Sequence, residues 1–230
     1  MFFNLIHHPI RTEGGGHSMK ATSLLKVSVL VGITCSAVMI GSAFVRAEEG
    51  GVKTTLENLQ AAYNGESNAH ARYLAFAQKA DEEGYGKVAS LFRAAAQAEE
   101  IHLNNHAEVI KSLNAPPSAD IKEPEVKSTR ENLEAALAGE NYERIAMYPE
   151  FLEQAKKEDN GKAVRTFKWA MEAETKHAEY YQAALNDLEN WRDGKMTFLV
   201  CTECGYTTDD MSTQKCPVCS YPRNKMDEVE

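Results

Sequence analysis

The sequence predicts a mainly α-helical fold, in which a four-helix bundle is followed by a small β module that is held together by metal. Three observations predict this fold. Apolar residues recur at helical spacing in four segments between residues 54 and 190, Glu-x-x-His occurs twice within those segments, and two Cys-x-x-Cys pairs lie near the C-terminus. The two kinds of motif offer different donor atoms, so they predict two different metal sites.

The composition limits the classes of partner. The 230 residues include 25 Lys and Arg against 34 Asp and Glu, which gives a net charge of −9. A chain with this charge repels the phosphate backbone, so we expect no nucleic-acid partner. The hydrophobic and charged shares, 43% and 26%, are typical of a soluble globular protein. Most of the acidic excess is expected on solvated helix faces, and the rest at metal sites.

Residues 1–47 are predicted to be an upstream extension followed by a secretory signal peptide that starts at Met19. A basic start precedes an uncharged run over residues 27–45, and cleavage is expected after Ala47, where a small residue suits signal peptidase. The alternative is an uncleaved membrane anchor through residues 27–45, because 19 uncharged residues approach the roughly 20 that span a bilayer. We therefore expect an exported, periplasmic protein.

Residues 48–192 are predicted to form the four-helix bundle. Capping boxes open the first and third helices at Thr54 and Ser128. Short glycine-containing turns separate the two helices of each pair, which makes them antiparallel neighbours. The connection over residues 114–127 contains three prolines, so it is expected to run the length of the bundle without being helical throughout.

The bundle is predicted to be a duplication of one helical hairpin. The pattern Asn-Leu-x-Ala-Ala-x-x-Gly-Glu ends at Glu66 and recurs 74 residues later, ending at Glu140. Glu-x-x-His occurs at residues 99–102 and again, 75 residues later, at residues 174–177. We therefore expect a bundle with pseudo-two-fold symmetry and one long crossover.

The repeat places acids in the core of all four helices. Residues three apart share a helix face, so each Glu-x-x-His directs a carboxylate and an imidazole to the same side. Buried carboxylates cost several kcal/mol each unless they are compensated, and two divalent cations such as iron or manganese would compensate them. The predicted ligands are Glu66, Glu99, His102, Glu140, Glu174 and His177, with Glu143 as a further acid on nearly the same face. Glu66 and Glu140 are expected to bridge; the alternative is that some of these acids lie on the surface.

Other polar side chains share these helix faces. Tyr73 and Tyr148 follow Glu66 and Glu140 by about two helical turns, so they either pack in the core or donate hydrogen bonds to ligand carboxylates. His106 has no histidine partner in the repeat, and it is expected to be a core or rim histidine rather than a ligand.

Residues 193–230 are predicted to be a polar linker and a four-cysteine module. The pairs Cys201-x-x-Cys204 and Cys216-x-x-Cys219 enclose one tetrahedral site. The spacing leaves iron and structural zinc open, and two disulfides are a further alternative in an oxidising compartment. A module of this size needs such a staple to fold.

A duplicated carboxylate–histidine bundle followed by Cys-x-x-Cys-Gly-Tyr and Cys-Pro-Val-Cys resembles the rubrerythrin family over residues 54–223. The resemblance implies that residues 48–192 form a ferritin-like bundle with two non-haem irons. It also implies that residues 193–230 carry a rubredoxin-like domain in which four cysteines hold one iron, with zinc as the alternative metal.

The resemblance further implies roles for individual residues. His102 would exchange with Glu143 as a ligand when one iron changes oxidation state, and Tyr73 and Tyr148 would lie beside the cluster. The implied iron ligands are Glu66, Glu99, Glu140, Glu143, Glu174, His177, Cys201, Cys204, Cys216 and Cys219.

The function implied by the resemblance is that of a peroxidase in oxidative stress protection. Hydrogen peroxide would be reduced to water, with electrons relayed through the four-cysteine iron from a donor protein such as a rubredoxin or a cytochrome. A head-to-tail homodimer or larger homo-oligomer is expected. Two alternatives use the same ligands: a ferroxidase or iron-handling protein, and a non-enzymatic metal-binding redox protein with a structural zinc tail. The predicted export departs from the mainly cytoplasmic pattern of the family.

Overall fold

The structure, a computed structural model, describes residues 53–230. The predicted extension, signal peptide, cleavage site and membrane anchor lie outside the described residues. Within residues 53–230, no helix is both long enough and apolar enough to span a bilayer.

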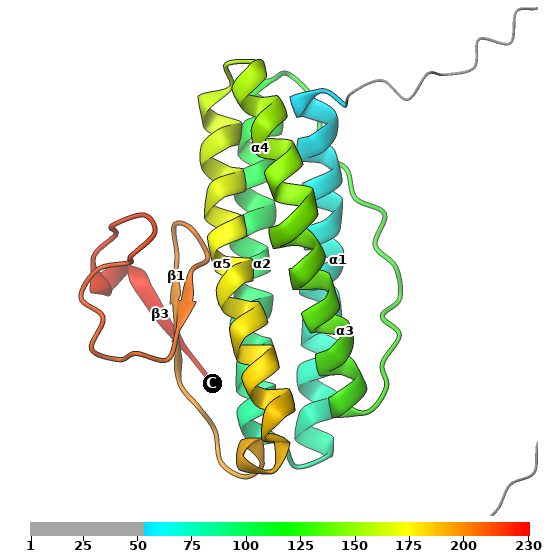
Figure 1. The fold of residues 1–230 in the computed structure, drawn as a ribbon, viewed down its shortest axis with the longest axis vertical. Helices are drawn as coiled ribbons and strands as arrows, with labels where there is room; N and C mark the ends of the chain where they lie inside the picture. Colours follow the sequence, from blue (N-terminus) through cyan, green and yellow to red (C-terminus); the bar gives the residue numbers. More distant parts are fainter. Residues whose placement is uncertain (1–52) are drawn as a thin grey trace, which may run out of the picture. The chain divides into compact units, whose positions relative to one another are not determined.

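The helices form the expected bundle with its long crossover (Figure 1). The helical elements of the bundle are α1 (Thr55–Glu82), α2 (Gly86–Ser112), α3 (Thr129–Tyr142), η1 (Glu143–Met147), α4 (Tyr148–Lys157) and α5 (Gly161–Asn186). The bundle has four helical rods, and the third consists of three consecutive elements, α3, the π-helix η1 and α4. The structure thus confirms a mainly α-helical, ferritin-like architecture.

Local sequence signals explain where these helices start and how the crossover is held. Both predicted capping boxes are present: the Thr54 and Ser128 side chains each accept from the backbone N–H three residues on, and the glutamate there accepts from the cap. Residues 114–127 have no helix, as expected. Asn64 and Asn68 on α1 accept backbone hydrogen bonds from this segment at 2.8 Å, so it is fastened along the bundle.

Two apolar clusters occupy the two ends of the bundle, and the acids lie between them. One cluster contains Tyr73, Phe92 and Tyr181, and the other contains Tyr148 and Phe167. In each of the four helical rods the buried acids and histidines fall between the parts that contribute to the two clusters. The apolar packing at both ends of the bundle therefore helps to offset the cost of burying charged side chains in its middle.

The π-helix η1 changes which residues of the third rod face the core. A regular helix would place Met147, seven residues after Glu140, on the inner face with it. In the structure the π turn adds one residue, so that Tyr148 is fully buried and Met147 only partly. A count of 3.6 residues per turn throughout therefore fails at Met147, although Phe151, four residues further on, is buried as that count expects.

The C-terminal segment forms a small antiparallel sheet with strand order β2-β1-β3, made from β1 (Phe198–Cys201), β2 (Thr207–Thr208) and β3 (Met226–Val229). The sheet lies beside α2 and α5 (Figure 1). Phe198 and Val200 are fully buried in one of the apolar clusters of the bundle. The β module thus shares a core with the helices.

The linker to the sheet is also held against the bundle. The Asp193 N–H donates to Gly84 O at 3.3 Å, and the Met196 N–H donates to the Ser90 hydroxyl at 3.3 Å. Between these contacts a Cβ on Gly86 would overlap the carbonyl of Gly194, so the close approach requires glycine. The path of the chain from α5 to β1 is therefore defined by its own contacts.

Candidate metal centres

The predicted bundle ligands form two overlapping clusters of buried side chains. In each cluster the possible ligand atoms all lie within 4.8 Å of one another. The first cluster contains Glu66, Glu99, His102 and Glu174, and the second contains Glu99, Glu140, Glu174 and His177. Glu99 and Glu174 belong to both, so the structure favours them as the bridging carboxylates. The expectation that Glu66 and Glu140 bridge is wrong; each belongs to one cluster.

The two histidines direct the same ring nitrogen into the site. His102 Nδ1 lies 2.9 Å from Glu99 Oε2 and 3.0 Å from Glu174 Oε1. His177 Nδ1 lies 2.9 Å from Glu174 Oε2 and 3.7 Å from Glu140 Oε1. Each Nδ1 is therefore placed to bind a cation that the carboxylates also bind.

The β module determines which nitrogen of each histidine carries the proton. His102 Nε2 lies 3.2 Å from the carbonyl of Cys204, which can only accept, so this nitrogen donates. His177 Nε2 lies 3.1 Å from the Thr207 hydroxyl, which itself donates to Gly205 O at 3.1 Å. Both rings therefore carry a proton on Nε2, and a metal that displaces the proton facing the carboxylates would bind at Nδ1.

Two tyrosines hold the outer carboxylates from opposite halves of the repeat. The Tyr73 hydroxyl donates to Glu140 Oε1 at 2.6 Å, and the Tyr148 hydroxyl donates to Glu66 Oε1. Both tyrosines are fully buried. Of the two interpretations left open by the sequence, hydrogen bonding to ligand carboxylates is therefore the one that the structure shows.

Glu143 lies outside both clusters. It begins the π-helix and is partly buried, whereas His102 lies among the acids. Burial, together with the nearby Glu66 and Glu140, raises the pKa of Glu143 well above its usual range. The structure therefore corresponds to the state in which His102, and not Glu143, is a ligand. The exchange between the two residues stays a prediction.

The donor atoms of the clusters fit two divalent cations. Burial raises the pKa of Glu99 well above its usual range and that of Glu140 to about 7, and neighbouring Glu174 adds to both shifts. Glu140 and Glu174 overcome the burial of His177 and raise its pKa to about 10. Six polar atoms of the clusters make no hydrogen bond of acceptable geometry, although His102 and His177 lie close to Glu174: Glu66 Oε2, Glu99 Oε1, Glu140 Oε2, both oxygens of Glu174 and His177 Nδ1. Buried oxygens and a nitrogen that lack partners are what two hard cations would satisfy.

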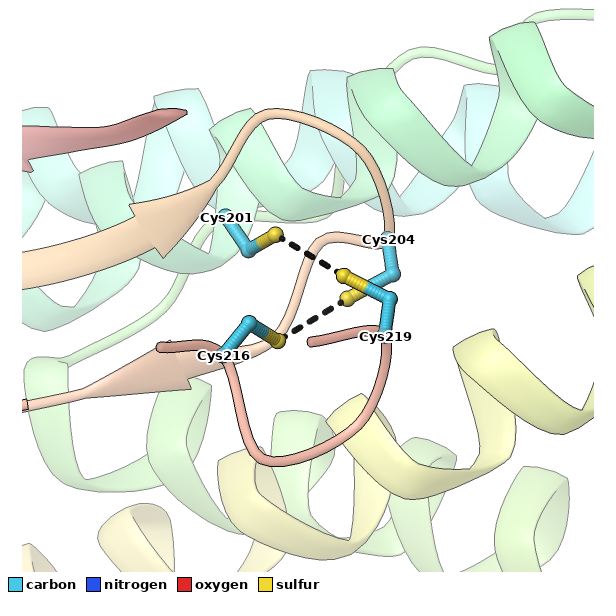
Figure 2. A group of neighbouring side chains, drawn as sticks. All are labelled: Cys201, Cys204, Cys216 and Cys219. Carbon is cyan, nitrogen blue, oxygen red and sulfur yellow. Dashed lines mark hydrogen bonds between the residues drawn. The ribbon is translucent and has the colours of Figure 1, made fainter. Parts of the chain in front are cut away.

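The four cysteines of the β module converge at one point (Figure 2). The Sγ atoms of Cys201 and Cys219 are 3.4 Å apart, as are those of Cys204 and Cys216. This separation is far longer than the roughly 2.05 Å of a disulfide, and all four thiols are free, so the disulfide alternative is excluded in this structure. Four sulfurs about 2.3 Å from one metal would lie about 3.8 Å apart, close to the observed spacing.

The thiol pKa values also favour a cation at this point. Hydrogen bonds from Cys201 and Cys204 lower the pKa of Cys216 to about 2. Burial raises the pKa of Cys219 to about 12. The cluster thus forms one thiolate easily and resists a second, whereas a metal would hold all four sulfurs ionised.

Comparisons with known proteins agree with this geometry. A family model described as Rubrerythrin matches residues 57–185. Nigerythrin of Nitratidesulfovibrio vulgaris is 42% identical over 174 residues, which cover 75% of this chain and 85% of that protein. Rubrerythrin-2 of Clostridium acetobutylicum is 37% identical over 176 residues, which cover 74% of this chain and 94% of that protein. The solved structure of fully reduced, all-ferrous nigerythrin matches with a TM-score of 0.72 at 38% identity, and covers 80% of this chain and 91% of that one.

The fold and the two centres define a ferritin-like di-metal protein with a four-cysteine module. The chain belongs to the rubrerythrin family. Its cofactors are accordingly a di-iron site held by the carboxylates and histidines of the bundle, together with a four-cysteine cluster that is consistent with one iron site.

Sequence reasoning missed several groups that surround the bundle site. The Cys204 carbonyl and the Thr207 hydroxyl come from the β module, and no spacing rule predicts that they meet histidines on α2 and α5. Thr166 on α5 contacts His106, which the sequence assigned only to the core. The one available signal was that His106 lies four residues after His102, on the same helix face.

Proposed function

We propose that this protein reduces hydrogen peroxide to water at its di-iron site, with electrons supplied through the four-cysteine iron. The observation that supports the proposal is the contact between the two centres. Cys204 belongs to the four-cysteine site, and its carbonyl accepts a hydrogen bond from Nε2 of His102, whose other nitrogen faces the bundle site. An electron carrier in direct contact with a ligand of a second metal site is suited to re-reduce that site.

The protein groups have distinct tasks in this reaction. One hydrogen peroxide takes up two electrons and two protons, its O–O bond breaks, and two water molecules form. When bound, the two ferrous irons supply both electrons. Glu99 and Glu174 hold the two metal positions together, and Tyr73 and Tyr148 fix the outer carboxylates by hydrogen bonds. Four carboxylates favour the higher charge of ferric iron, which makes the oxidation favourable.

The test is anaerobic stopped-flow oxidation of the fully reduced, iron-loaded protein. We expect peroxide to oxidise the bundle site faster than dioxygen does at the same concentration. The matched variant is Cys219→Ser, which removes a ligand of the tail and leaves the bundle intact. This variant should still react once with peroxide but should not turn over with an external electron donor. Equal rates with the two oxidants would rule the proposal out.

A ferroxidase uses the same bundle ligands, but it does not need a redox centre in contact with them. Multiple turnover with added ferrous iron, and none with a rubredoxin-type donor, would favour that function. A structural zinc tail would also remove the basis of the proposal. Metal analysis and a visible spectrum distinguish a zinc tail from an iron tail, because ferric tetrathiolate is red and the zinc form is colourless.

Three further parts of the proposal concern partners and location. A soluble donor protein, such as a rubredoxin or a cytochrome, would reduce the four-cysteine iron. Export with cleavage after Ala47 stays a prediction, and N-terminal sequencing of the mature protein tests it. The head-to-tail homo-oligomer is also a prediction, and light scattering tests it; within the described residues the two centres approach each other without a second copy.

A further inference from the structure

A chain of hydrogen bonds leads from the di-iron site to the surface of the bundle. The Tyr148 hydroxyl donates to Glu66, His106 Nε2 lies 3.2 Å from the Tyr148 oxygen, and the Thr166 hydroxyl lies 3.0 Å from His106 Nδ1. All four side chains are buried, and Thr166, the most exposed of them, is only 4% exposed. Each side chain comes from a different rod of the bundle: Glu66 from α1, His106 from α2, Tyr148 from α4 and Thr166 from α5.

The chemistry of the groups determines the direction of every bond. The Glu66 carboxylate only accepts, so it takes the single proton of the Tyr148 hydroxyl. The Tyr148 oxygen must then accept from His106, which places the imidazole proton on Nε2. His106 Nδ1 is consequently an acceptor, and it takes the proton of the Thr166 hydroxyl. Every donor therefore points toward the metal site.

The outer end of the chain reaches solvent. Thr166 lines a cavity of about 280 Å³ between α2, α5 and the β module. Three charged residues that line the same cavity, Glu108, Lys162 and Arg165, are exposed, so the cavity opens to water. A cavity of this volume holds several water molecules, which can give a proton to Thr166.

The other half of the repeat lacks this chain. A shift of 75 residues pairs His106 with Tyr181 and Thr166 with Leu91. The Tyr181 hydroxyl is buried without a hydrogen-bond partner, and Leu91 is fully buried in an apolar cluster. The same fold is thus built on the Glu140 side with apolar and unpartnered groups. Packing alone does not require the polar chain on the Glu66 side.

We propose that Thr166, His106 and Tyr148 form a proton path from this cavity to Glu66 during peroxide reduction. The inference depends on the proposed function, which consumes two protons for each O–O bond that breaks. Glu66 takes up the proton that Tyr148 releases and would pass it to the oxygen that leaves as water, so the carboxylate returns to its starting state. Each group on the path receives one proton as it releases another, so its charge is the same before and after. His106 receives at Nδ1 and releases from Nε2.

The decisive variant is Thr166→Val, which removes the outermost hydroxyl but keeps the bond from Tyr148 to Glu66. Single-turnover oxidation by peroxide should slow by at least about 10-fold, since proton transfer by a placed group contributes roughly 10²–10⁴-fold. The solvent isotope effect in D2O should increase. Thr166→Ser should restore both quantities. Tyr181→Phe, which removes the hydroxyl at the position that pairs with His106 in the other half, should leave both unchanged.

A second variant and a measurement without turnover keep the proposal testable if Thr166→Val does not bind iron. His106→Ala should slow single-turnover oxidation by peroxide, and added imidazole should restore the rate, because free imidazole can carry the proton in place of the missing side chain. In the zinc-substituted protein, ¹⁵N NMR should show the His106 proton on Nε2, with Nδ1 as an acceptor. A proton on Nδ1 would overturn the path, as would an unchanged rate and isotope effect in Thr166→Val while the wild type reacts rapidly with peroxide. A wild type that does not prefer peroxide would instead overturn the proposed function.

Discussion

The two halves of the bundle have the same plan and different surroundings. Each half contributes an outer carboxylate, Glu66 or Glu140, and a Glu-x-x-His. Each outer carboxylate accepts a hydrogen bond from a tyrosine of the other half. The Glu66 side has a polar chain to the surface, whereas the Glu140 side is closed by Tyr181 and its apolar neighbours. The third rod also carries a π turn that α1 lacks.

This comparison shows which parts of a duplicated site must stay equal. The metal positions need matched carboxylates and imidazoles, because cation charge has to be balanced on both sides. The side chains that surround the ligands are free to differ between the halves, since a single substitution there changes access to water without changing a ligand. The π turn belongs to the same class of change: it brings Tyr148, eight residues after Glu140, to the place that Tyr73 reaches seven residues after Glu66.

The largest expected effect comes from a ligand that both halves share. Glu174→Ala removes a carboxylate from both clusters, so the bundle should lose both metals, whereas Glu140→Ala should lose only the metal beside His177. Metal analysis measures the difference, and absorbance of the four-cysteine iron in the same sample is the control for folding. Retention of one bundle metal in Glu174→Ala would show that the halves bind independently.

The next effect tests the contact of the β module with the His102 side. Gly205 has φ +77°, and a Cβ there would overlap His102 Nε2. Gly205→Ala should displace the module from His102 and slow re-reduction of the bundle site, because electron transfer slows as the two centres move apart. Stopped-flow oxidation of the four-cysteine iron measures this step. Thr207→Val, which removes the hydrogen bonds of this hydroxyl to His177 and Gly205 O but adds no overlapping atom at His102, should have a smaller effect. Equal rates in Gly205→Ala and wild type would exclude this contact as the electron route.

The two tyrosines give a smaller and more specific comparison. Tyr73→Phe and Tyr148→Phe each remove one hydrogen bond to a ligand carboxylate, and each should weaken metal binding by about 10- to 100-fold. Competition with a chelator measures the affinity. Only Tyr148→Phe should also change the solvent isotope effect of peroxide reduction. The same isotope effect in both variants would show that the halves are alike in proton supply.

The smallest effect is a dependence of stability on pH. In the metal-free protein the raised pKa of His177, about 10, stabilises the fold below pH 6.5, and this contribution is lost as pH rises toward 10. The raised pKa of Glu140, about 7, destabilises the fold increasingly between pH 4.5 and 7. Metal-free Tm should therefore fall as pH rises from 6 to 9.

Metal binding should reverse this trend, because it needs deprotonated ligands. The Tm difference between zinc-loaded and metal-free protein should widen over the same pH range, by about 2–4 °C for each kcal/mol. Glu140→Gln should reduce the dependence below pH 7. A difference in Tm that is independent of pH would contradict these shifts.

Much of the fold and of the inner site could be predicted from the sequence because both depend on local periodicity. The spacing of Glu99 and His102 places them on one helix face, and the repeat supplies the second pair. The four cysteines are brought together as predicted, because two short knuckles can enclose only one small ion. Capping residues likewise act within one turn, so the starts of α1 and α3 were predicted correctly.

The groups that the sequence could not place depend on distances between helices. Which carboxylates are shared, which tyrosine serves which acid, and which backbone carbonyl meets His102 depend on packing between segments 67 to 102 residues apart. The offset between Tyr73 and Tyr148 is visible in the sequence, but its meaning depends on the π turn.

By itself the sequence determined a duplicated helical hairpin, its metal-binding faces and a four-cysteine module, since these follow from spacing along one chain. Only the tertiary structure decided that Glu99 and Glu174 belong to both clusters and that the module contacts both histidines. It also decided that a hydrogen-bonded chain through His106 and Thr166 leads from one half to a cavity. The physical reason is that ligand identity is local, whereas hydrogen-bond partners and access to solvent are properties of packed surfaces.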